Sequence, residues 1–247
     1  MGADVHAPAR LRRFGALAAL LVLVGLFASI GPGRAVGAAK LVVLGAATPA
    51  NPSCPESCQA VGKTTGFQTA IGATKGPFVV PYRGRIVAWS IKLSAPRANQ
   101  IDFFKDFYGG EPRARLAVLK PIQKQIKVGH QVYKLKSQSP IEDLGPFLGT
   151  TTTFTLQSPL RVKPGQVVGL TIPTWAPAFA VGQANNTAWR ASRKKAACDN
   201  ADDIQAGTAH EAVGQERLYG CQYTTARLLY SATVVGEPNA PTPPKKK

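Results

Sequence analysis

The chain has few acidic residues and few histidines, and both shortages restrict the chemistry that it can perform. Its 247 residues include 13 Asp and Glu against 30 Lys and Arg, and only three His, for a net charge of +17 at pH 7. General acid–base catalysis and zinc binding draw mainly on these scarce residues. The composition therefore favours a binding or structural role over catalysis.

A second long apolar run is also missing, which excludes a membrane protein with several spans. The single run, residues 14–30, follows Arg10, Arg12 and Arg13 and ends before Gly31, Pro32 and Gly33. Small residues follow up to Ala39. This is the layout of a secretory signal peptide, and we expect cleavage after Ala38. The prediction is a secreted, extracellular protein, and the alternative is membrane anchoring through an uncleaved N-terminal segment.

Signals for lipid attachment are lacking at both ends. A lipoprotein needs a Cys directly after the small residues, but the first is Cys54, and residues 237–247 form a Pro- and Lys-rich stretch that we expect to be a flexible tail. Removing residues 1–38 leaves 26 basic and 12 acidic residues, a net charge of +14. Such a charge suggests an anionic polymer or lipid surface as partner, with nucleic acid an unlikely one because of export; the alternative is that the charge only keeps the protein soluble.

Cysteines number only four, and all lie in the exported part. An even count in an oxidising compartment favours disulfides, and we expect the local pairs Cys54–Cys58 and Cys198–Cys221. The spacing is a poor match for a zinc site, which normally shows pairs separated by two residues.

Sustained helical periodicity is absent, and short segments rich in Val, Ile, Thr and aromatics alternate with Gly, Pro, Ser and Asn. The pattern predicts an all-β protein, an antiparallel two-sheet β-sandwich of jelly-roll type, with a barrel as the alternative. The clear strands are expected at 85–93, 114–119, 131–136, 150–156, 167–172 and 227–235. Weaker strands are expected at 40–44, 67–71, 78–82, 178–181 and 187–191.

One short helix is expected at residues 101–108, where Ile101, Phe104, Phe107 and Tyr108 recur at helical spacing. The expected organisation is a signal peptide (1–38), an N-terminal segment with the Cys54/Cys58 loop (39–60), a single sandwich domain (61–236) and the tail.

Intact catalytic motifs are lacking too. His210-Glu211 begins like a zinc-protease helix, but residue 214 is Gly where the second His is required, and no Gly-x-Ser-x-Gly occurs. His130 or His210 could still serve a Ser-His-Asp hydrolase, although two surface histidines are the simpler interpretation.

Calcium is the one cofactor that the sequence suggests. Asp199, Asp202 and Asp203 form a local cluster of oxygen ligands without the spacing of an EF-hand loop. The alternative is a turn rich in Asx residues after Cys198.

Aromatic and basic side chains supply the candidate ligand contacts. Planar rings suit the faces of sugars, and the candidates are Trp175, Trp189, Tyr82 and Tyr108. Trp175 is either such a contact or a lid on the core. The densest basic cluster is Arg190, Arg193, Lys194 and Lys195, either a binding surface or a solvated loop.

The sequence thus predicts a secreted, non-catalytic β-sandwich with a binding or structural role outside the cell, directed at anionic or carbohydrate polymers of the envelope. The alternative is a secreted hydrolase with unassigned catalytic residues.

Overall fold

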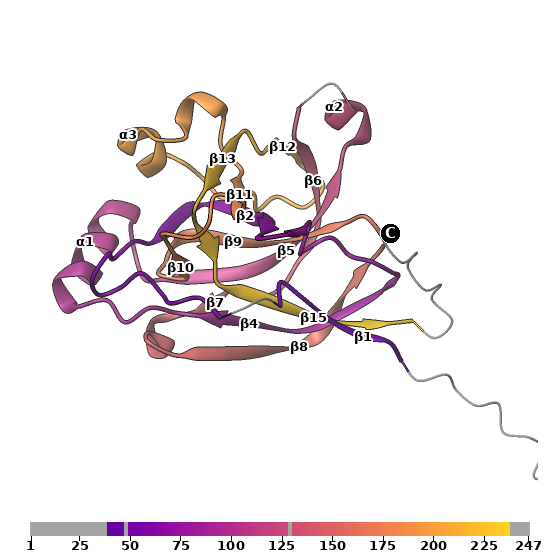
Figure 1. Cartoon of the computed structure of the whole chain (residues 1–247), viewed down its shortest axis with the longest axis horizontal. Helices are drawn as coiled ribbons and strands as arrows, with labels where there is room; N and C mark the ends of the chain where they lie inside the picture. The colour runs from indigo at the N-terminus through magenta and orange to yellow at the C-terminus, as the bar shows by residue number, and fades with distance from the viewer. Residues whose placement is uncertain (1–38, 47–48, 128–129, 238–247) are drawn as a thin grey trace, which may run out of the picture. The chain divides into compact units, whose positions relative to one another are not determined.

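Antiparallel strands dominate the computed structural model, which describes residues 39–46, 49–127 and 130–237 (Figure 1). The strands are β1 (Leu41–Leu44), β2 (Val61–Ile71), β3 (Thr74–Lys75), β4 (Gly84–Lys92), β5 (Arg113–Pro121), β6 (Val132–Gln138), β7 (Glu142–Asp143), β8 (Thr151–Val162), β9 (Val167–Ala176), β10 (Phe179–Ala180), β11 (Ala188–Ala191), β12 (Glu216–Leu218), β13 (Cys221–Thr224), β14 (Arg227–Leu228) and β15 (Tyr230–Gly236). The helices are α1 (Ala98–Tyr108), α2 (Gln123–Lys127) and α3 (Ala201–Gln205), with 3-10 turns η1 (Gly145–Phe147) and η2 (Lys195–Ala197). The expected signal peptide and most of the expected tail lie outside the described residues.

Two sheets face each other across the core, so the predicted two-sheet β-sandwich is confirmed. The smaller sheet has the order β1-β15-β4-β8, and the larger has the order β12-β6-β5-β9-β2-β11-β13 with β3 beside β2 and β7 beside β5. Strands β10 and β14 form a separate pair. In Figure 1 the smaller sheet lies below the larger one. No helix among the described residues is long and apolar enough to cross a membrane.

Apolar side chains from both sheets fill the space between them. Trp89 and Ile91 of β4 and Leu116 of β5 are fully buried, and Phe78 stacks on Tyr230 with ring centres 4.1 Å apart. The Tyr230 hydroxyl donates to the Val168 carbonyl at 3.0 Å and so links β15 to β9. Each such buried side chain contributes about 1.5–3 kcal/mol to folding.

Strand β4 departs from the simple alternation that its sequence suggests. Ile86 and Trp89 are both fully buried, although strict alternation places them on opposite faces. Val87 is an extra residue: Ile86 pairs with Val234 and Ala88 with Thr233. This β-bulge shifts the alternation by one residue.

Strand β9 continues past Pro173, where the sequence predicted its end. Pairing with β5 stops at Thr171, so the missing amide hydrogen of Pro173 costs no bond on that side. On the other side β2 has a register shift at Lys63, whose φ is 51°. The strand therefore reaches Ala176 without a lost ladder bond at the proline.

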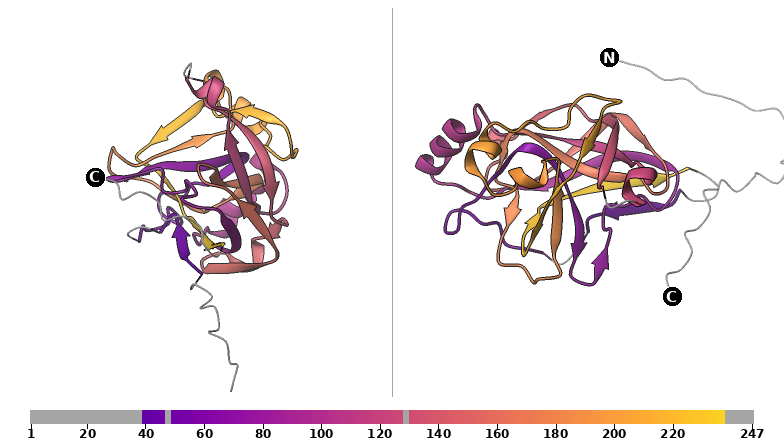
Figure 2. Two further views of the ribbon diagram at one scale, coloured as in Figure 1. Left: turned by 90° about the vertical axis from the view of Figure 1, so that its right-hand side faces the viewer. Right: turned by 90° about the horizontal axis from the view of Figure 1, so that it is seen from above.

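Helix α1 confirms the predicted helix and begins three residues earlier than expected. The Gln100 side chain accepts a hydrogen bond from the Arg97 backbone N–H at 2.8 Å and so stabilises the first turn. Phe104 is buried against Trp175, with ring centres 5.2 Å apart. Helices α1 and α3 lie at one end of the sandwich and α2 towards the other, as Figures 1 and 2 both show.

One of the weaker expected strands differs from the structure, and some short strands were not expected. Residues 78–82 make a single bridge, Val79 to Val167, in place of a strand. Strands β12 and β13 were not expected, because each is short and pairs only with residues far away in the sequence.

Candidate functional site

Trp175 is a lid on the core and cannot stack on a ligand. Its side chain is 0% exposed, and its Nε1 donates to the Gly110 carbonyl at 2.9 Å. The assignment as a ligand contact was wrong because β9 continues through this residue and turns its ring beneath α1. Tyr82 is buried as well, so the four aromatics form no exposed platform.

Trp189 is only 3% exposed, so it too is wrong as an open stacking surface. Its ring stacks on Tyr223 of the neighbouring strand with centres 4.6 Å apart. Gly66 lies beneath the ring, where a Cβ atom would come within 2.8 Å of it. Trp189 nevertheless lines a pocket together with Tyr108 and Arg193.

The basic cluster at residues 190–195 does not form a single surface. Arg190 is half-buried and donates to the Tyr219 carbonyl at 3.2 Å, and burial lowers its pKa. Arg193 is buried and donates to the Gly62 carbonyl at 2.6 Å. Only Lys194 and Lys195 are exposed, because Arg190 and Arg193 turn towards backbone carbonyls.

The three aspartates proposed as calcium ligands are not brought together. Asp199, Asp202 and Asp203 are all exposed, and no group of three acidic, His or Cys side chains in the described part of the chain could hold a metal. Asn200 instead accepts a hydrogen bond from the Asp203 backbone N–H at 3.0 Å and caps α3. The segment therefore begins helix α3, which differs from both the calcium site and the Asx-rich turn that the sequence suggested.

Both predicted disulfides, Cys54–Cys58 and Cys198–Cys221, are present. They are compatible with an extracellular location.

His210 is buried, which corrects its interpretation as a surface residue. Its Nδ1 lies 3.2 Å from the Tyr219 hydroxyl, and its Nε2 lies 3.0 Å from the Gln215 carbonyl. Both ring nitrogens are therefore occupied within the fold. His130 is exposed, with Nδ1 3.3 Å from the Gln125 side chain.

Lysines from three separate segments surround a recess of about 320 Å³, which we call the lysine recess. Lys120 comes from the end of β5, Lys136 from β6 and Lys163 from the turn between β8 and β9. All three side chains are exposed. The recess lies towards the end of the sandwich that carries α2 (Figure 1), since Gln123 of that helix also lines it.

A β-bulge and a tight turn determine the backbone positions of Lys136 and Lys163. Val118 pairs with Ser137 and Leu119 with Leu135, so Lys136 is the extra residue of a β-bulge in β6. Pro164 and Gly165, the latter with φ 78°, form the turn after Lys163. The Gln166 side chain accepts from the Lys163 backbone N–H at 2.7 Å. The turn is also bonded to Val80 at both Gly165 and Gln166.

The recess concentrates positive charge without a compensating acid. None of the residues that line it is acidic, and none of the four ion pairs in the described ranges includes its lysines. Lys134 of β6 lies opposite Lys120 on one side and opposite Glu216 of β12 on the other, so its charge has a neighbouring acid, and it does not line the recess.

Sequence reasoning missed this recess, although its turn at residues 163–165 was recognised. The lysines are 16 and 27 residues apart along the chain, so no local charge cluster marks them. The register of β5 with β6 and the position of the β8–β9 turn bring them together.

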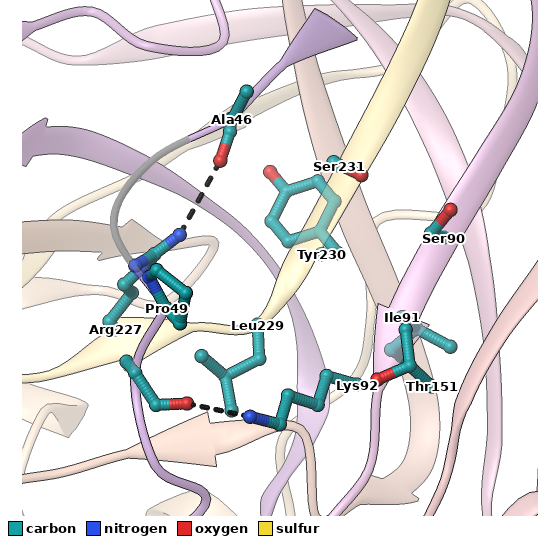
Figure 3. Close-up of a pocket in the computed structure, with 12 residues that line it drawn as sticks. Ala46, Pro49, Ser90, Ile91, Lys92, Thr151, Arg227, Leu229, Tyr230 and Ser231 are labelled. Atoms are coloured by element: carbon teal, nitrogen blue, oxygen red, sulfur yellow. Dashed lines mark hydrogen bonds between the residues drawn. The ribbon is translucent and has the colours of Figure 1, made fainter.

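A further pocket of about 200 Å³ lies between the loop after β1 and the smaller sheet, and two cations border it (Figure 3). The Lys92 Nζ donates to the Ala50 carbonyl at 3.1 Å, and an Arg227 Nη donates to the Gly45 carbonyl at 3.5 Å. These contacts join Gly45 to β14 and Ala50 to β4, so we assign the pocket a structural role.

Comparison with known proteins adds no relative: no family model, curated protein or solved structure matches the chain.

Proposed function

We propose that this is a secreted, non-catalytic protein that binds an anionic polymer of the cell envelope through the lysine recess. The observation that carries the proposal is the gathering of Lys120, Lys136 and Lys163 around one recess whose lining contains no acidic residue. Exposed cations without ion-pair partners bind polyanions by releasing counterions, and such binding is strongest at low salt.

The distribution of charge between the two ends of the sandwich favours the lysine recess as the binding site. Acidic and basic residues are mixed at the opposite end of the sandwich: Asp102, Asp106 and Lys105 lie on α1, Asp202 and Asp203 lie on α3, and Lys194 and Lys195 precede α3 in the chain. A polyanion meets acidic side chains at that end, whereas the lysine recess presents cations alone.

Lysine suits this role because its ammonium group is a point charge on a flexible side chain, whereas the guanidinium of arginine is planar and rigid. Three such groups tolerate an irregular polymer whose phosphates or carboxylates do not repeat at one spacing. The hydrolase alternative has no observation in its favour among the described residues.

The test is retention of the purified exported protein on insoluble anionic and neutral polysaccharides and on cell-wall preparations across a salt series. Two variants each remove three positive charges: Lys120/Lys136/Lys163→Gln at the recess, and Lys75/Lys194/Lys195→Gln at exposed positions elsewhere. The second variant is the matched control for net charge and also tests the basic segment near Trp189.

We expect retention on anionic material only, lost between roughly 0.1 and 0.5 M salt as the Debye length shrinks. The recess variant is expected to lose retention at low salt, and the control variant to keep it. Equal loss in both variants would reject the recess as the binding site, and absence of retention on any material would reject polymer binding.

A further inference from the structure

A second pocket, separate from the lysine recess, has a buried arginine and aromatic side chains on its wall. Its volume is also about 320 Å³, and Arg193, Tyr108, Trp189 and Tyr223 line it. Asp199, which is exposed, also borders it. The proposed polymer binding uses none of these residues.

Arg193 has an incomplete set of partners. One Nη donates to the Tyr223 hydroxyl at 3.2 Å and the other to the Gly62 carbonyl at 2.6 Å, both uncharged oxygens. Its Nε has no hydrogen-bond partner among the described residues, and no ion pair described in this structure includes it. The side chain is only 8% exposed. A buried guanidinium without an anion is unfavourable, because water no longer solvates its charge.

The guanidinium charge is close to the two tyrosine hydroxyls of the pocket. Burial raises the pKa of Tyr108 and of Tyr223, and the positive charge of Arg193 acts on both in the opposite direction. The Tyr108 hydroxyl donates to the Ala60 carbonyl at 3.1 Å, and the Tyr223 hydroxyl donates to the Cys198 carbonyl at 2.6 Å. These bonds fix the rings that form the wall.

Trp189 offers a second unused donor. Its Nε1 is buried and has no hydrogen-bond partner in the described part of the chain, while its side chain is 97% buried. The wall of the pocket thus includes two nine-tenths-buried side chains that each carry an N–H group without a partner among the described residues. Buried donors normally have partners, and ligand sites are a common reason for an exception.

We propose that this pocket binds a small organic carboxylate in which the acid group is attached to a six-membered ring. The carboxylate accepts hydrogen bonds from the Nε–H side of the Arg193 guanidinium, whose planar donors match two carboxylate oxygens. The ring contacts the aromatic side chains that line the pocket.

A single negative charge fits the pocket better than a phosphate. Arg193 is the only cation among the lining residues, and Asp199 at the border repels a second negative charge. Two sources share the proposed chemistry, a sugar acid and an aromatic acid, and the experiment separates them.

The test is isothermal titration of the exported protein with sodium glucuronate and with sodium benzoate, each compared with its neutral counterpart, glucose or benzyl alcohol. Tryptophan emission is recorded in parallel. Trp89 and Trp175 are fully buried and do not line the pocket, so a change on binding reports Trp189.

Arg193→Gln removes the charge, and Arg190→Gln is the matched control, because Arg190 lies three residues away and does not line the pocket. Ile204→Trp fills the pocket from α3 and keeps Arg193, so it tests the site even if Arg193→Gln fails to fold.

We expect one of the two carboxylates to bind with an emission change and its neutral counterpart to bind at least about tenfold more weakly. Arg193→Gln and Ile204→Trp are expected to lose binding by a similar factor, and Arg190→Gln and the lysine-recess variant to retain it. Absence of binding by both acids at millimolar concentration, or equal binding of acid and neutral counterpart, would overturn the proposal.

Discussion

His210 forms a buried hydrogen-bonded pair with Tyr219. A carbonyl oxygen only accepts, so the contact with the Gln215 carbonyl places the proton on Nε2 and leaves Nδ1 to accept from the Tyr219 hydroxyl. The His210 backbone N–H donates to the Thr65 hydroxyl at 3.0 Å. The neutral imidazole is therefore the form that this network requires.

This pair predicts a pH-dependent stability. Burial lowers the pKa of His210 below its usual 6.5, the nearby Arg217 lowers it further, and the Gln215 carbonyl opposes both. Below pH 6.5 the unfolded chain binds a proton that the folded chain does not, so stability falls as the pH falls.

We expect the free energy of unfolding to decrease between pH 7 and pH 5.5, by no more than about 1.4 kcal/mol per pH unit from this group. Denaturant titrations of His210→Gln should give a flatter profile, and His130→Gln, an exposed position, should keep the native slope. Identical slopes in all three proteins would show that His210 is not the responsible group.

Gly62 is a second position where one residue determines a local structure. A Cβ atom there would lie 2.4 Å from both the Thr174 carbonyl oxygen and the Tyr108 ring. We expect Gly62→Ala to destabilise the protein by about 1–3 kcal/mol, as overpacking does. Gly145→Ala is the control, since its closest contact is an ordinary 3.4 Å. Urea midpoints compare them, and equal midpoints would contradict the close approach.

At the scale of elements, the two disulfides differ in the length of chain that they close. Cys198–Cys221 spans 23 residues and Cys54–Cys58 only 4. In the chain-entropy treatment the longer loop contributes about 3.5 kcal/mol and the shorter about 2 kcal/mol.

We therefore expect Cys198→Ala/Cys221→Ala to lower the free energy of unfolding more than Cys54→Ala/Cys58→Ala does. Calorimetric melting of both double variants shows which of them loses more stability. A larger loss from the Cys54/Cys58 variant would mean that native contacts, rather than loop length, determine the effect.

Much of the strand pattern was predictable from the sequence, and the exceptions share a cause. The predicted strand 85–93 lies within one residue of β4 at each end, but the bulges at Val87 and Lys136 were missed. A bulge depends on the register with a partner strand, which the sequence of a single strand does not contain. Pro173 was predicted to end a strand, but β9 continues past it. The proline is tolerated because β9 has no β5 partner beyond Thr171, and the sequence of β9 alone does not show where that partner ends.

The candidate sites were less predictable than the strands. Trp189 and Arg193 were identified as binding residues, but as exposed ones, because their burial depends on packing against β2 and β13. The lysine recess had no local signal apart from its turn. Sequence reasoning recognises residues that act together when they are neighbours in the chain, and here they are neighbours only in the fold.

At the scale of the whole molecule, cations without neighbouring acids gather at the lysine recess. Residues 39–247 carry a net charge of +14, and around α1 and α3 acidic residues are mixed with basic ones. The end that carries α2 has the lysine recess. No acidic residue lines the recess, so an anionic partner there meets cations alone.

The most direct test of this account is the salt dependence of binding to a soluble polyanion such as polygalacturonate. The slope of log Kd against log salt reports the number of charges neutralised, at roughly 0.7–0.9 per contact on nucleic acids. We predict a steep dependence for the native protein, a slope smaller by about two to three for Lys120/Lys136/Lys163→Gln, and little change for Lys75/Lys194/Lys195→Gln. Equal slopes for the two variants, or binding that does not respond to salt, would contradict the assignment of the lysine recess as the polymer-binding site.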